Sequence, residues 1–409
     1  MSNINIKLDI LSLTITAQSI DIKGDIIINV VSKNAHSRCH KCGKNATKGN
    51  GTAPKRKIRH LSVFDTPVYL IITPIRYLCE NCDTTTTEQY DWCERNASIT
   101  NKLADYLMRS LINSTIEDVS KKYAISVKII QTALDRQINQ TADWSDIHDL
   151  NTIGIDEISL KKGHQDYVAI VSAKSADKLM VIGVLKDRTK ETVKKFLTSI
   201  PLRLRSTVTS VCTDMYDGFV SAAVEVFGIQ ALVIDRYHLA KLYRKPLDRV
   251  RIKEMQRIKR TIDKEEYAEL KGVMWILRKQ HECLTEADKS KLELLYQYSP
   301  QLKRAHTYAL KLTHIFNAKT SRKSALAKID RWINTVEHSD MRCFTQFITC
   351  LKKYKPYIAN YFKSRKSSGF VEGLNNKIKV AKRRCYGIVK TESLFQRLFL
   401  DLRGYEVYA

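Results

Sequence analysis

The chain has 409 residues, of which 44% are hydrophobic, so it is long enough for two or three domains with a substantial core. Its 69 Lys and Arg residues exceed its 43 Asp and Glu residues, giving a formal charge of +26 at pH 7. This excess is spread along the whole chain, and such basic proteins most often bind a polyanion, usually nucleic acid. The N-terminus lacks the pattern of a secretory signal, and the apolar runs are far too short for a transmembrane helix, so we expect neither.

Residues 1–95 are predicted to form a small β-rich module that binds zinc. Of the ten cysteines in the chain, four form two C-x-x-C pairs: Cys39, Cys42, Cys79 and Cys82. Two strand-like runs between the pairs, 57–63 and 68–78, predict a hairpin that brings the pairs together, and four thiolates are what a tetrahedral structural Zn²⁺ requires. The other cysteines are scattered singly, which is typical of buried thiols in a reducing compartment and not of a disulfide framework.

Three further side chains of this segment are weaker candidates for the same ion. Cys93 is a possible fifth thiol, which we interpret as a buried or half-exposed bystander. His36 and His40 lie close to the first pair and are alternative ligands, since imidazole can replace a thiolate at zinc.

Residues 96–148 are predicted to form a helix-turn-helix segment. Leucines at a spacing of four indicate a first helix, a second begins at Thr115, and Ser126 can cap a third after the short break 124–126. The side chains expected to be exposed on the third helix are Lys128, Gln131, Thr132, Asp135 and Arg136. The same pattern occurs in ordinary helical linkers, so the DNA-binding interpretation depends on the basic charge and on the neighbouring zinc module.

Residues 149–240 alternate between strand and helix patterns. Three strand-like runs come first, beginning with 152–159, and two further strands end at Asp214 and Asp235, each followed by a helix. Three strands, then helix, strand, helix, strand and helix, is the order of a ribonuclease H-like domain. In that order the first strand is central and lies beside the fourth, so Asp156 and Asp214 should come within reach of each other.

Asp156 is a carboxylate within an apolar, β-branched strand. Burying an unpaired charge is costly, so two interpretations of Asp156 are open. It is either a solvated residue at the end of the strand that caps a turn, or its charge is balanced by a positive partner, and the most specific such partner is a metal ion. Two nearby acidic residues compete for that role. Strand alternation points Glu157 to the opposite face, and Asp217, at a helix start, is better explained as a cap.

Residues 241–365 are predicted to be an all-α insertion, because they form long, charged, amphipathic patterns with almost no glycine. We expect Trp275 and Trp332 in the core of this insertion. The alternative is that they stack on an unpaired or flipped base, as aromatic side chains do in single-strand binding.

Residues 366–409 are predicted to return to the ribonuclease H-like core. One helix face carries Glu372, Asn375, Asn376 and Lys379 at helical spacing. The basic residues around that face are Lys377, Lys382, Arg383 and Arg384. Glu372 is therefore either a partner in a surface ion pair or the third ligand of a metal site formed with the two aspartates.

Several sequence blocks together match a known family. They are GIDEIS at 154–159, TDMYDGF at 213–219, DRYHL at 235–239, VEGLNNKIK at 371–379 and RRCYG at 383–387. Each block alone is weak, but in this order and at these separations they are specific. The chain resembles the DDE transposases of bacterial insertion sequences, in particular the insertion-sequence L-three family. The resemblance covers essentially the whole chain, from the zinc module and helix-turn-helix to a ribonuclease H-like domain split by a helical insertion.

The resemblance implies that Asp156, Asp214 and Glu372 are catalytic and bind two Mg²⁺ or Mn²⁺ ions, with Asp156 bridging both. Carboxylate oxygens suit such hard cations, and two of them can assist in-line displacement at phosphorus, both in strand hydrolysis and in joining the freed 3′-hydroxyl to a new strand. The candidates for support of this site are Asp235, His238 and Asn375. For the first two, an aspartate–histidine hydrogen bond with a purely structural role is an equal alternative.

The resemblance also implies double-stranded DNA as the partner, both as inverted-repeat element ends and as target. The zinc module and helix-turn-helix would recognise sequence, while Lys and Arg on the core and insertion hold phosphates. The candidate DNA-binding residues are Lys128, Gln131, Thr132, Arg136, Lys377, Lys379, Lys382 and Arg383. Because two element ends must be cut in concert, we expect a homodimer on DNA, in the bacterial cytoplasm and associated with the nucleoid.

Two other functions fit parts of the sequence. A DNA-binding regulator with a zinc finger, a helix-turn-helix and an inactive nuclease core would bind element ends without cutting them. A structure-selective nuclease, such as a junction resolvase, would cut according to DNA shape without strand transfer, but it leaves the two N-terminal modules without a purpose.

Overall fold

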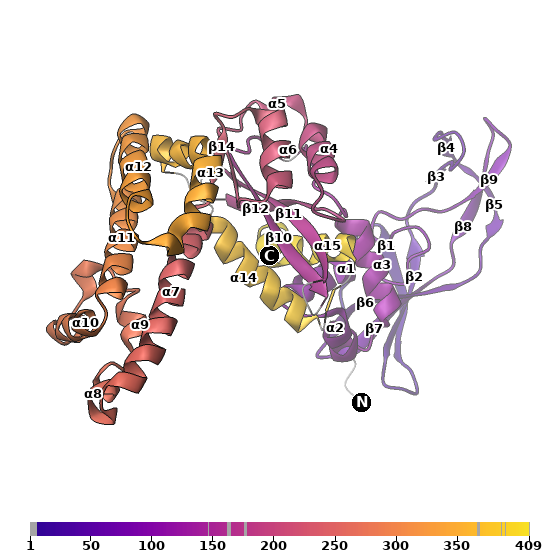
Figure 1. The fold of residues 1–409 in the computed structure, drawn as a ribbon. Coiled ribbons are helices and arrows are strands. Elements are labelled where there is room, and N and C mark those ends of the chain that lie inside the picture. The colour runs from indigo at the N-terminus through magenta and orange to yellow at the C-terminus, as the bar shows by residue number, and fades with distance from the viewer. Residues whose placement is uncertain are drawn as a thin grey trace. The chain divides into compact units, whose positions relative to one another are not determined.

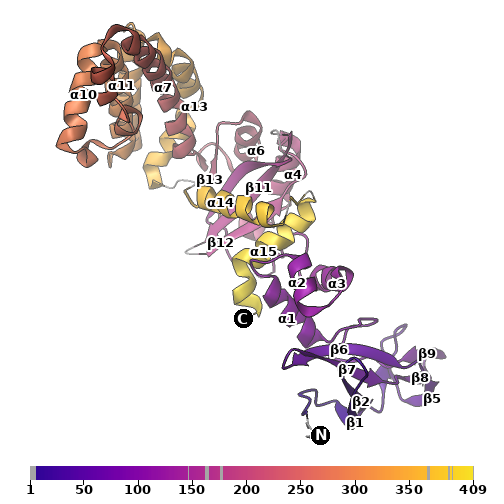
Figure 2. The ribbon, with the colours of Figure 1, turned by 90° about the horizontal axis from the view of Figure 1, so that it is seen from below.

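The computed structural model describes residues 6–145, 147–161, 165–175, 178–365, 369–385, 387–388 and 390–408 (Figures 1 and 2). Over these residues the chain is a mixed α/β structure that divides into two compact units. Unit 1 runs to Gln140 and also takes in Arg384 and the chain from Gln396 onward, whereas unit 2 spans Thr141–Arg383 and Gly387–Phe395. No helix among the described residues is long and apolar enough to cross a membrane.

Unit 1 begins with a four-stranded sheet. Its strands are β1 (Leu13–Ile20), β2 (Ile26–Ser32), β6 (Arg56–Val63) and β7 (Thr66–Ile72), in the order β1-β2-β7-β6. Alternate residues of β2 and β7 are buried, and Ile28, Ile58 and Leu70 are fully enclosed, as expected for a sheet with one face on a core. Phe64 and Asp65 form the two-residue turn between β6 and β7, and both have the positive φ that such tight hairpins require.

Five short strands form the second β-rich part of unit 1. They are β3 (Ser37–Arg38), β4 (Asn45–Ala46), β5 (Lys48–Thr52), β8 (Ile75–Cys79) and β9 (Thr84–Thr87). β3 pairs with β4, and the other three form a sheet in the order β5-β8-β9. The run 68–78, which we expected to be one strand, is therefore two strands in two sheets, because Pro74 lies between β7 and β8 and cannot donate to a ladder.

Helices follow the sheets of unit 1. They are α1 (Asn101–Leu111), α2 (Ile116–Tyr123) and α3 (Val127–Gln137). The side chains of Thr100, Thr115 and Ser126 each accept a hydrogen bond from a backbone N–H in the first turn. The predictions that a helix begins at Thr115 and that Ser126 caps the next helix are therefore confirmed. Ala124 ends α2 in the left-handed region, which turns the chain sharply into α3.

The last helix, α15 (Thr391–Tyr408), contributes its part from Gln396 onward to unit 1. Arg397 Nη1 donates to the carbonyl oxygen of Leu111 at 3.1 Å. Leu400 is fully buried in the same apolar cluster as the three earlier helices of this unit. The C-terminal end of the chain therefore completes a core that the N-terminal helices begin.

Unit 2 contains a five-stranded sheet with a central first strand. Its strands are β10 (Thr152–Lys161), β11 (Gln165–Ser175), β12 (Lys178–Val184), β13 (Ser210–Thr213) and β14 (Leu232–Ile234). Their order is β12-β11-β10-β13-β14, with β10 antiparallel to β11 and parallel to β13. The prediction that the first strand of this region lies beside the fourth is confirmed.

Helices cover both faces of this sheet (Figures 1 and 2). α4 (Lys190–Ser199), α5 (Leu202–Arg205) and α6 (Asp217–Phe227) lie on one side, and α14 (Gly369–Arg384) lies on the other. Ile153 and Ile155 of β10 belong to the apolar cluster that contains α4 and α6. Strand alternation then directs Asp156 and Ile158 to the face covered by α14.

The described chain from Arg236 to Arg365 is mostly helical. Its helices are α7 (Arg236–Thr261), α8 (Lys264–Glu269), α9 (Val273–Ile276), α10 (Glu286–Tyr298), α11 (Pro300–Asn317), α12 (Arg322–Glu337) and α13 (Thr345–Ser364). α13 returns to the sheet, where Asn360 Nδ2 donates to the carbonyl oxygen of Leu232 at 2.8 Å. Trp332 is buried as expected, but Trp275 is 64% exposed, so the prediction that both tryptophans lie in the core is wrong for Trp275.

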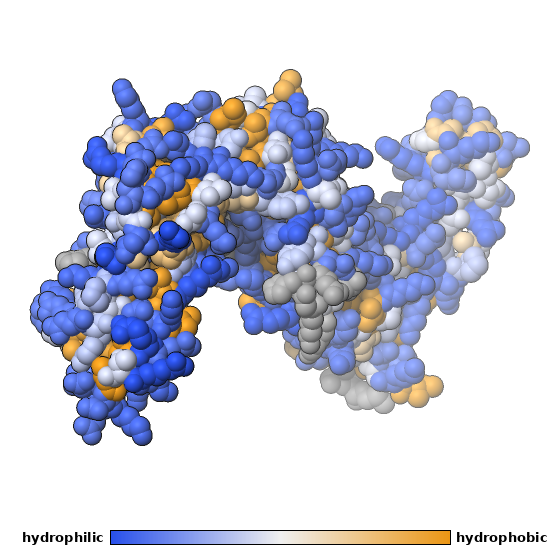
Figure 3. Space-filling view, viewed as in Figure 1, coloured by the Kyte–Doolittle hydropathy of each residue, from blue (hydrophilic) through white to orange (hydrophobic). Residues whose placement is uncertain are grey.

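Hydrophilic side chains cover most of the face drawn in Figure 3, with hydrophobic side chains in separate smaller groups. This distribution agrees with the high content of charged residues, 27% of the chain. The surface therefore suits contacts with polar and charged partners better than one large apolar interface.

Candidate metal centres and nucleic-acid surface

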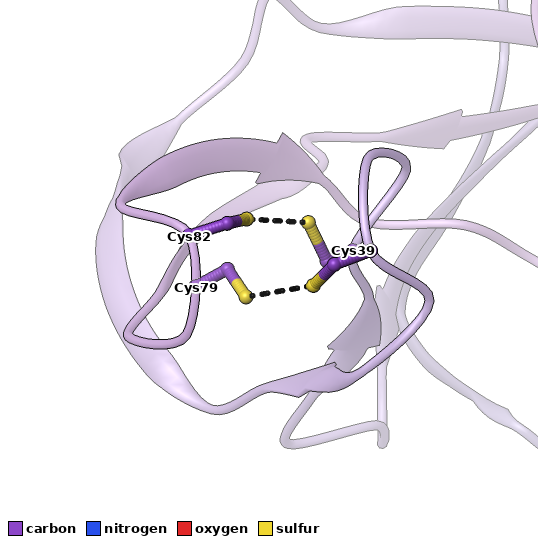
Figure 4. Close-up of side chains that lie close together, drawn as sticks. Cys39, Cys79 and Cys82 are labelled. Atoms are coloured by element: carbon purple, nitrogen blue, oxygen red, sulfur yellow. Dashed lines mark hydrogen bonds between the residues drawn. The ribbon is translucent and has the colours of Figure 1, made fainter.

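Cysteine side chains of unit 1 converge on one point (Figure 4). Cys39 and Cys42 lie in the turn between β3 and β4, Cys79 ends β8, and Cys82 lies in the turn to β9. The Sγ atoms of Cys39 and Cys82 are 3.5 Å apart, those of Cys42 and Cys79 are also 3.5 Å apart, and all four lie within 4.8 Å of one another. Zn–S bonds of about 2.3 Å in a tetrahedron separate the sulfurs by roughly 3.8 Å, so the cluster fits Zn²⁺.

Backbone groups shape this cluster. Gly43 has a φ of 71°, and its N–H donates to the carbonyl oxygen of Cys39 at 2.9 Å, which closes the first turn. Hydrogen bonds from the N–H groups of Cys42 and Lys41 lower the pKa of Cys39 to about 6. In contrast, burial raises the pKa of Cys79 to about 11. A buried thiolate is stable only beside a cation, which is consistent with a metal-ligating role.

The alternative zinc ligands lie outside the cluster. Cys93 is buried in the core of the first sheet, where its Sγ donates to the carbonyl oxygen of Ile99 at 3.5 Å. His40 Nδ1 is 3.2 Å from Thr86 Oγ1, and His36 is exposed. The ligand cluster of unit 1 therefore consists of the four predicted thiols, and neither histidine nor Cys93 belongs to it.

Asp156 and Asp214 are neighbours near the middle of the sheet in unit 2. β10 and β13 pair in parallel with Ile155 opposite Thr213, so the residues that follow lie side by side. Asp156 is only 9% exposed, and burial raises its pKa. Burial also raises the pKa of Asp214 to about 6, and the negative charge of Asp156 adds to this rise. Two desolvated carboxylates destabilise each other when ionised, and they are the ligands that hard divalent cations prefer.

The α14 helix meets this pair from the far end of the sequence. Asn375 Nδ2 donates to Asp156 Oδ2, and Lys382 Nζ donates to the carbonyl oxygen of Ser159, so α14 runs along β10. Asn375 Oδ1 is buried and has no hydrogen-bond partner among the described residues. Glu372 lies on α14 about one helical turn before Asn375. The side chain of Glu372 is outside the described part of the structure.

Asp235 and His238 lie at the start of α7, near the two aspartates. Asp235 Oδ1 accepts a hydrogen bond from the N–H of Tyr237 at 3.0 Å and so caps α7. His238 Nε2 lies 3.8 Å from Asp235 Oδ2. Beyond the effect of burial, a positive charge on His238 lowers the pKa of Asp156 and the charge of Asp235 raises it. The pair therefore has a structural contact and also contributes to the electrostatic field around the carboxylates.

An arginine that the sequence did not single out connects to this site. Arg188 Nη1 is 2.5 Å from Glu157 Oε2, and its guanidinium lies 4.5 Å from the ring of Tyr167 and 5.0 Å from that of Tyr216. The N–H of Tyr216 donates to Asp214 Oδ1 at 3.0 Å. Arg188 therefore neutralises Glu157 and packs against the residue that orients Asp214. No motif or periodicity in the sequence marks this residue.

A second unpredicted contact fixes the loop after β13. Tyr354 Oη of α13 lies 2.9 Å from the carbonyl oxygen of Met215 and 2.6 Å from Asp217 Oδ1. Lys353 Nζ is 2.7 Å from Asp217 Oδ2. Asp217, which we expected to cap α6, therefore binds α13 instead, and the N-cap position is occupied by Tyr216. The partners are separated by 137 residues, so no local signal could have revealed them.

The residues predicted to contact DNA lie on α3 and α14. The exposed ones are Lys128, Thr132, Arg136, Lys379 and Arg383, and the half-buried ones are Gln131, Lys377 and Lys382. The predicted DNA-binding residues of α14 lie on the same helix as Asn375, which donates a hydrogen bond to Asp156. The predicted residues of α3 belong to unit 1. The exposed α3 residues border a groove of about 640 Å³.

Comparisons with known proteins bear on these sites. The family model for DDE transposases of the ISL3 type, described as transposase, matches residues 153–398. The chain is 26% identical over 365 residues to the transposase for insertion sequence element IS1001 of Bordetella parapertussis, covering 88% of this chain and 87% of that protein. It is 25% identical over 391 residues to the transposase for insertion sequence element IS1557 of Mycobacterium tuberculosis, covering 90% of this chain and 86% of that protein.

Proposed function

Because the chain belongs to the insertion-sequence L-three family of DDE transposases, we propose that it binds the ends of an insertion sequence and there cuts and joins DNA strands. The observation that carries this proposal is the hydrogen bond from Asn375 of α14 to Asp156 of β10. It supports a site formed by Asp156, Asp214 and Glu372, since Glu372 shares a helix face with Asn375.

In this proposal the sheet of unit 2 is a ribonuclease H-like core, and the helices α7 to α13 are its insertion. The strand order β12-β11-β10-β13-β14 supports the assignment, because it makes β10 central and puts β13 beside it. The helices α2 and α3 act as a helix-turn-helix, supported by their caps and by the sharp turn at Ala124.

Asp156, Asp214 and Glu372 would hold two Mg²⁺ or Mn²⁺ ions, and the four clustered cysteines would hold one structural Zn²⁺. When bound between carboxylates, such a pair of hard cations activates the attacking oxygen and stabilises the leaving oxygen in displacement at phosphorus. The raised pKa of Asp214 supports the assignment, because a carboxylate that burial disfavours in its ionised form is balanced by a nearby cation.

The residues around the carboxylates keep them oriented. Asn375 Nδ2 holds one oxygen of Asp156, and the N–H of Glu157 holds the other at 2.7 Å. The N–H of Tyr216 holds Asp214. Fixing these oxygens would keep their remaining lone pairs oriented for the metal ions that the site would hold, as hydrogen bonds to metal-binding carboxylates do in general. Asp235 and His238 add support from the start of α7.

The protein acts on double-stranded DNA in this proposal. Unit 1 recognises the inverted-repeat ends, the basic residues of α14 hold phosphates of the strand to be cut, and a homodimer brings two ends together. We expect this activity at the nucleoid of a bacterial cell, since both element ends and target are chromosomal DNA.

An Asp156→Asn variant tests the proposal. The substrate is identified by searching the DNA that flanks the gene for inverted repeats that the protein binds. On that duplex the variant should lose Mg²⁺-dependent cleavage and strand joining, while binding remains within about twofold of wild type, because only a reacting group is removed. Glu191→Gln, an exposed acidic residue of α4, is the matched control and should cut normally.

Two results would contradict the proposal. If wild type binds element ends but cuts with neither Mg²⁺ nor Mn²⁺, the protein is a DNA-binding regulator. If it cuts branched DNA according to shape and never joins strands, it is a structure-selective nuclease.

A further inference from the structure

Two grooves in unit 1 share one wall. The first, of about 640 Å³, follows α3 and is bordered there by Lys128 and Arg136. The second, of about 650 Å³, lies over the strands β8 and β9 and is bordered by Arg76. Residues 94–96 border both grooves. The two grooves together form one track, which we call the N-terminal track, from α3 to the strand that carries Cys79.

The shared wall of the track is a tight turn. The N–H of Ala97 donates to the carbonyl oxygen of Glu94 at 3.0 Å, and Asn96 between them has a φ of 60°, which asparagine tolerates better than most residues. Arg56 Nη2 donates to the carbonyl oxygen of Ala97 at 2.6 Å, which ties the turn to β6. The turn is therefore a fixed ridge, and its second residue, Arg95, is exposed.

Exposed cations follow the whole track. They are Lys55, Arg76, Arg95, Lys128 and Arg136. Within the described part of the chain, no hydrogen bond from their side chains and no ion pair neutralises these five charges. The acidic residues along the same walls are Glu88, Glu94 and Asp105. Glu88 is only 5% exposed, so the five exposed cations face two exposed carboxylates, Glu94 and Asp105, and positive charge dominates the accessible walls.

We propose that the N-terminal track holds the sugar–phosphate backbone of duplex DNA beside the segment contacted by α3. The α3 helix and the β8–β9 strands then bind adjacent stretches of one duplex, and Arg95 on the ridge contacts the phosphates between them. A duplex presents one negative charge per about 1.7 Å of its axis, which suits a row of separated cations better than a single small anion does. This inference rests on the proposed function, since it extends the DNA-binding surface assigned to α3.

Footprinting of the full-length protein tests the geometry. The probe is a duplex of about 40 base pairs, roughly four helical turns, that carries the element end, without added divalent metal so that no strand is cut. Wild type should protect two adjacent backbone patches from hydroxyl radicals. Arg76→Ala should lose the patch held by β8 and β9 and keep the one held by α3. Lys23→Ala, an exposed cation in the turn between β1 and β2, is the matched control and should keep both.

Salt dependence tests the chemistry of the contact. Arg76→Ala and Arg95→Ala should each weaken binding about 3- to 10-fold on element ends and on unrelated duplexes alike, and should lower the slope of log affinity against log salt by about 0.9. Arg95→Lys should restore most of the affinity, because a phosphate contact needs a positive charge and not a particular base-reading geometry. Zinc content is measured for Arg76→Ala, and Lys55→Ala replaces it if the zinc is lost.

The outcomes separate this inference from the proposed function. The N-terminal track is overturned if wild type protects a single patch at α3 and if Arg76→Ala and Arg95→Ala match Lys23→Ala in affinity and salt slope. That result leaves the proposed cleavage and joining of DNA in place. Two patches on a duplex that wild type never cuts overturn the proposed function and leave the track in place.

Discussion

The cysteine cluster of unit 1 and the aspartate pair of unit 2 are both donor sets for metal ions, but the chain builds them differently. The cysteines come from two short turns, which a hydrogen bond of 2.6 Å from Lys44 Nζ to Asn81 Oδ1 ties together. The aspartates come from neighbouring parallel strands, and their surroundings depend on α13 and α14 from the far end of the sequence. One site is local and the other is assembled from distant parts of the chain.

The two sites also differ in their charge before any metal is bound. In the cysteine cluster, Cys39 is ionised at neutral pH because its pKa is lowered to about 6, whereas the buried thiol of Cys79 stays protonated because its pKa is raised to about 11. Asp214 ionises above a pKa of about 6, next to a second buried aspartate. A metal ion bound by the cysteines would therefore complete that cluster as part of folding, whereas the ionised aspartate pair opposes folding.

Loss of a cysteine ligand should have the largest effect. Structural zinc contributes on the order of 10 kcal/mol to the folding of small modules, so Cys79→Ser should lose about one zinc per chain together with binding to element ends. Metal analysis and proteolysis of the strands β3, β4, β5, β8 and β9 provide the measurement. Cys283→Ser, an exposed thiol of unit 2, should keep its zinc. Full zinc content in Cys79→Ser would contradict a four-thiolate site.

Removing the charge of Asp214 should have the opposite effect on stability. The pKa of Asp214 is about 6 in the folded protein against 3.8 ordinarily, so ionisation costs stability fully above pH 6, and the cost vanishes below pH 3.8. This difference corresponds to about 3 kcal/mol, so Asp214→Asn should be more stable than wild type by that amount near about pH 8, and the gain should shrink toward about pH 4. Urea unfolding without added Mg²⁺ measures it.

Added Mg²⁺ provides the control for this prediction. It should raise the free energy of unfolding of wild type and leave that of Asp214→Asn almost unchanged, because only wild type keeps the complete donor set. Equal stability of the two proteins at alkaline pH would mean that Asp214 is not desolvated.

Loss of the Asn375 contact should have the smallest of these effects. Asn375→Ala removes the hydrogen bond that orients Asp156, and loss of such an outer-shell partner usually weakens metal binding or activity about 10- to 100-fold. The Mg²⁺ concentration for half-maximal cleavage should rise accordingly while DNA binding stays constant. Asn376→Ala, the exposed neighbour, is the matched control. If cleavage by the two variants depends on Mg²⁺ in the same way, Asn375 does not support the metal site, and the assignment of α14 to that site is wrong.

The features that could be predicted from sequence have local physical causes. Thr115 and Ser126 are caps because their side chains reach a backbone N–H in the next turn. The central position of β10 follows from the order of strands and helices. Pro74 could have shown that 68–78 is not one strand, because proline interrupts a ladder.

The features that could not be predicted depend on partners far away in the sequence. Arg188 and Tyr354 contact the site through Glu157 and Asp217, and neither pair has a characteristic spacing. Trp275 has the aromatic ring typical of a core residue, but it is exposed and contacts the guanidinium of Arg278. Helical spacing grouped Asn375 with Glu372 on one face of the helix, but the hydrogen bond from Asn375 to Asp156 depends on the fold.

The helix α15 completes the core of unit 1, although it is synthesised long after the other helices of that unit. The helices α1 to α3 leave the ribosome early, but Arg397 and Leu400, which bind and fill their core, are made only after unit 2 has been synthesised. A gene truncated before Gln396 would therefore yield a unit 1 that lacks part of its own core. We expect such shortened copies to be cleared by proteolysis and not to persist as end-binding competitors of the intact protein.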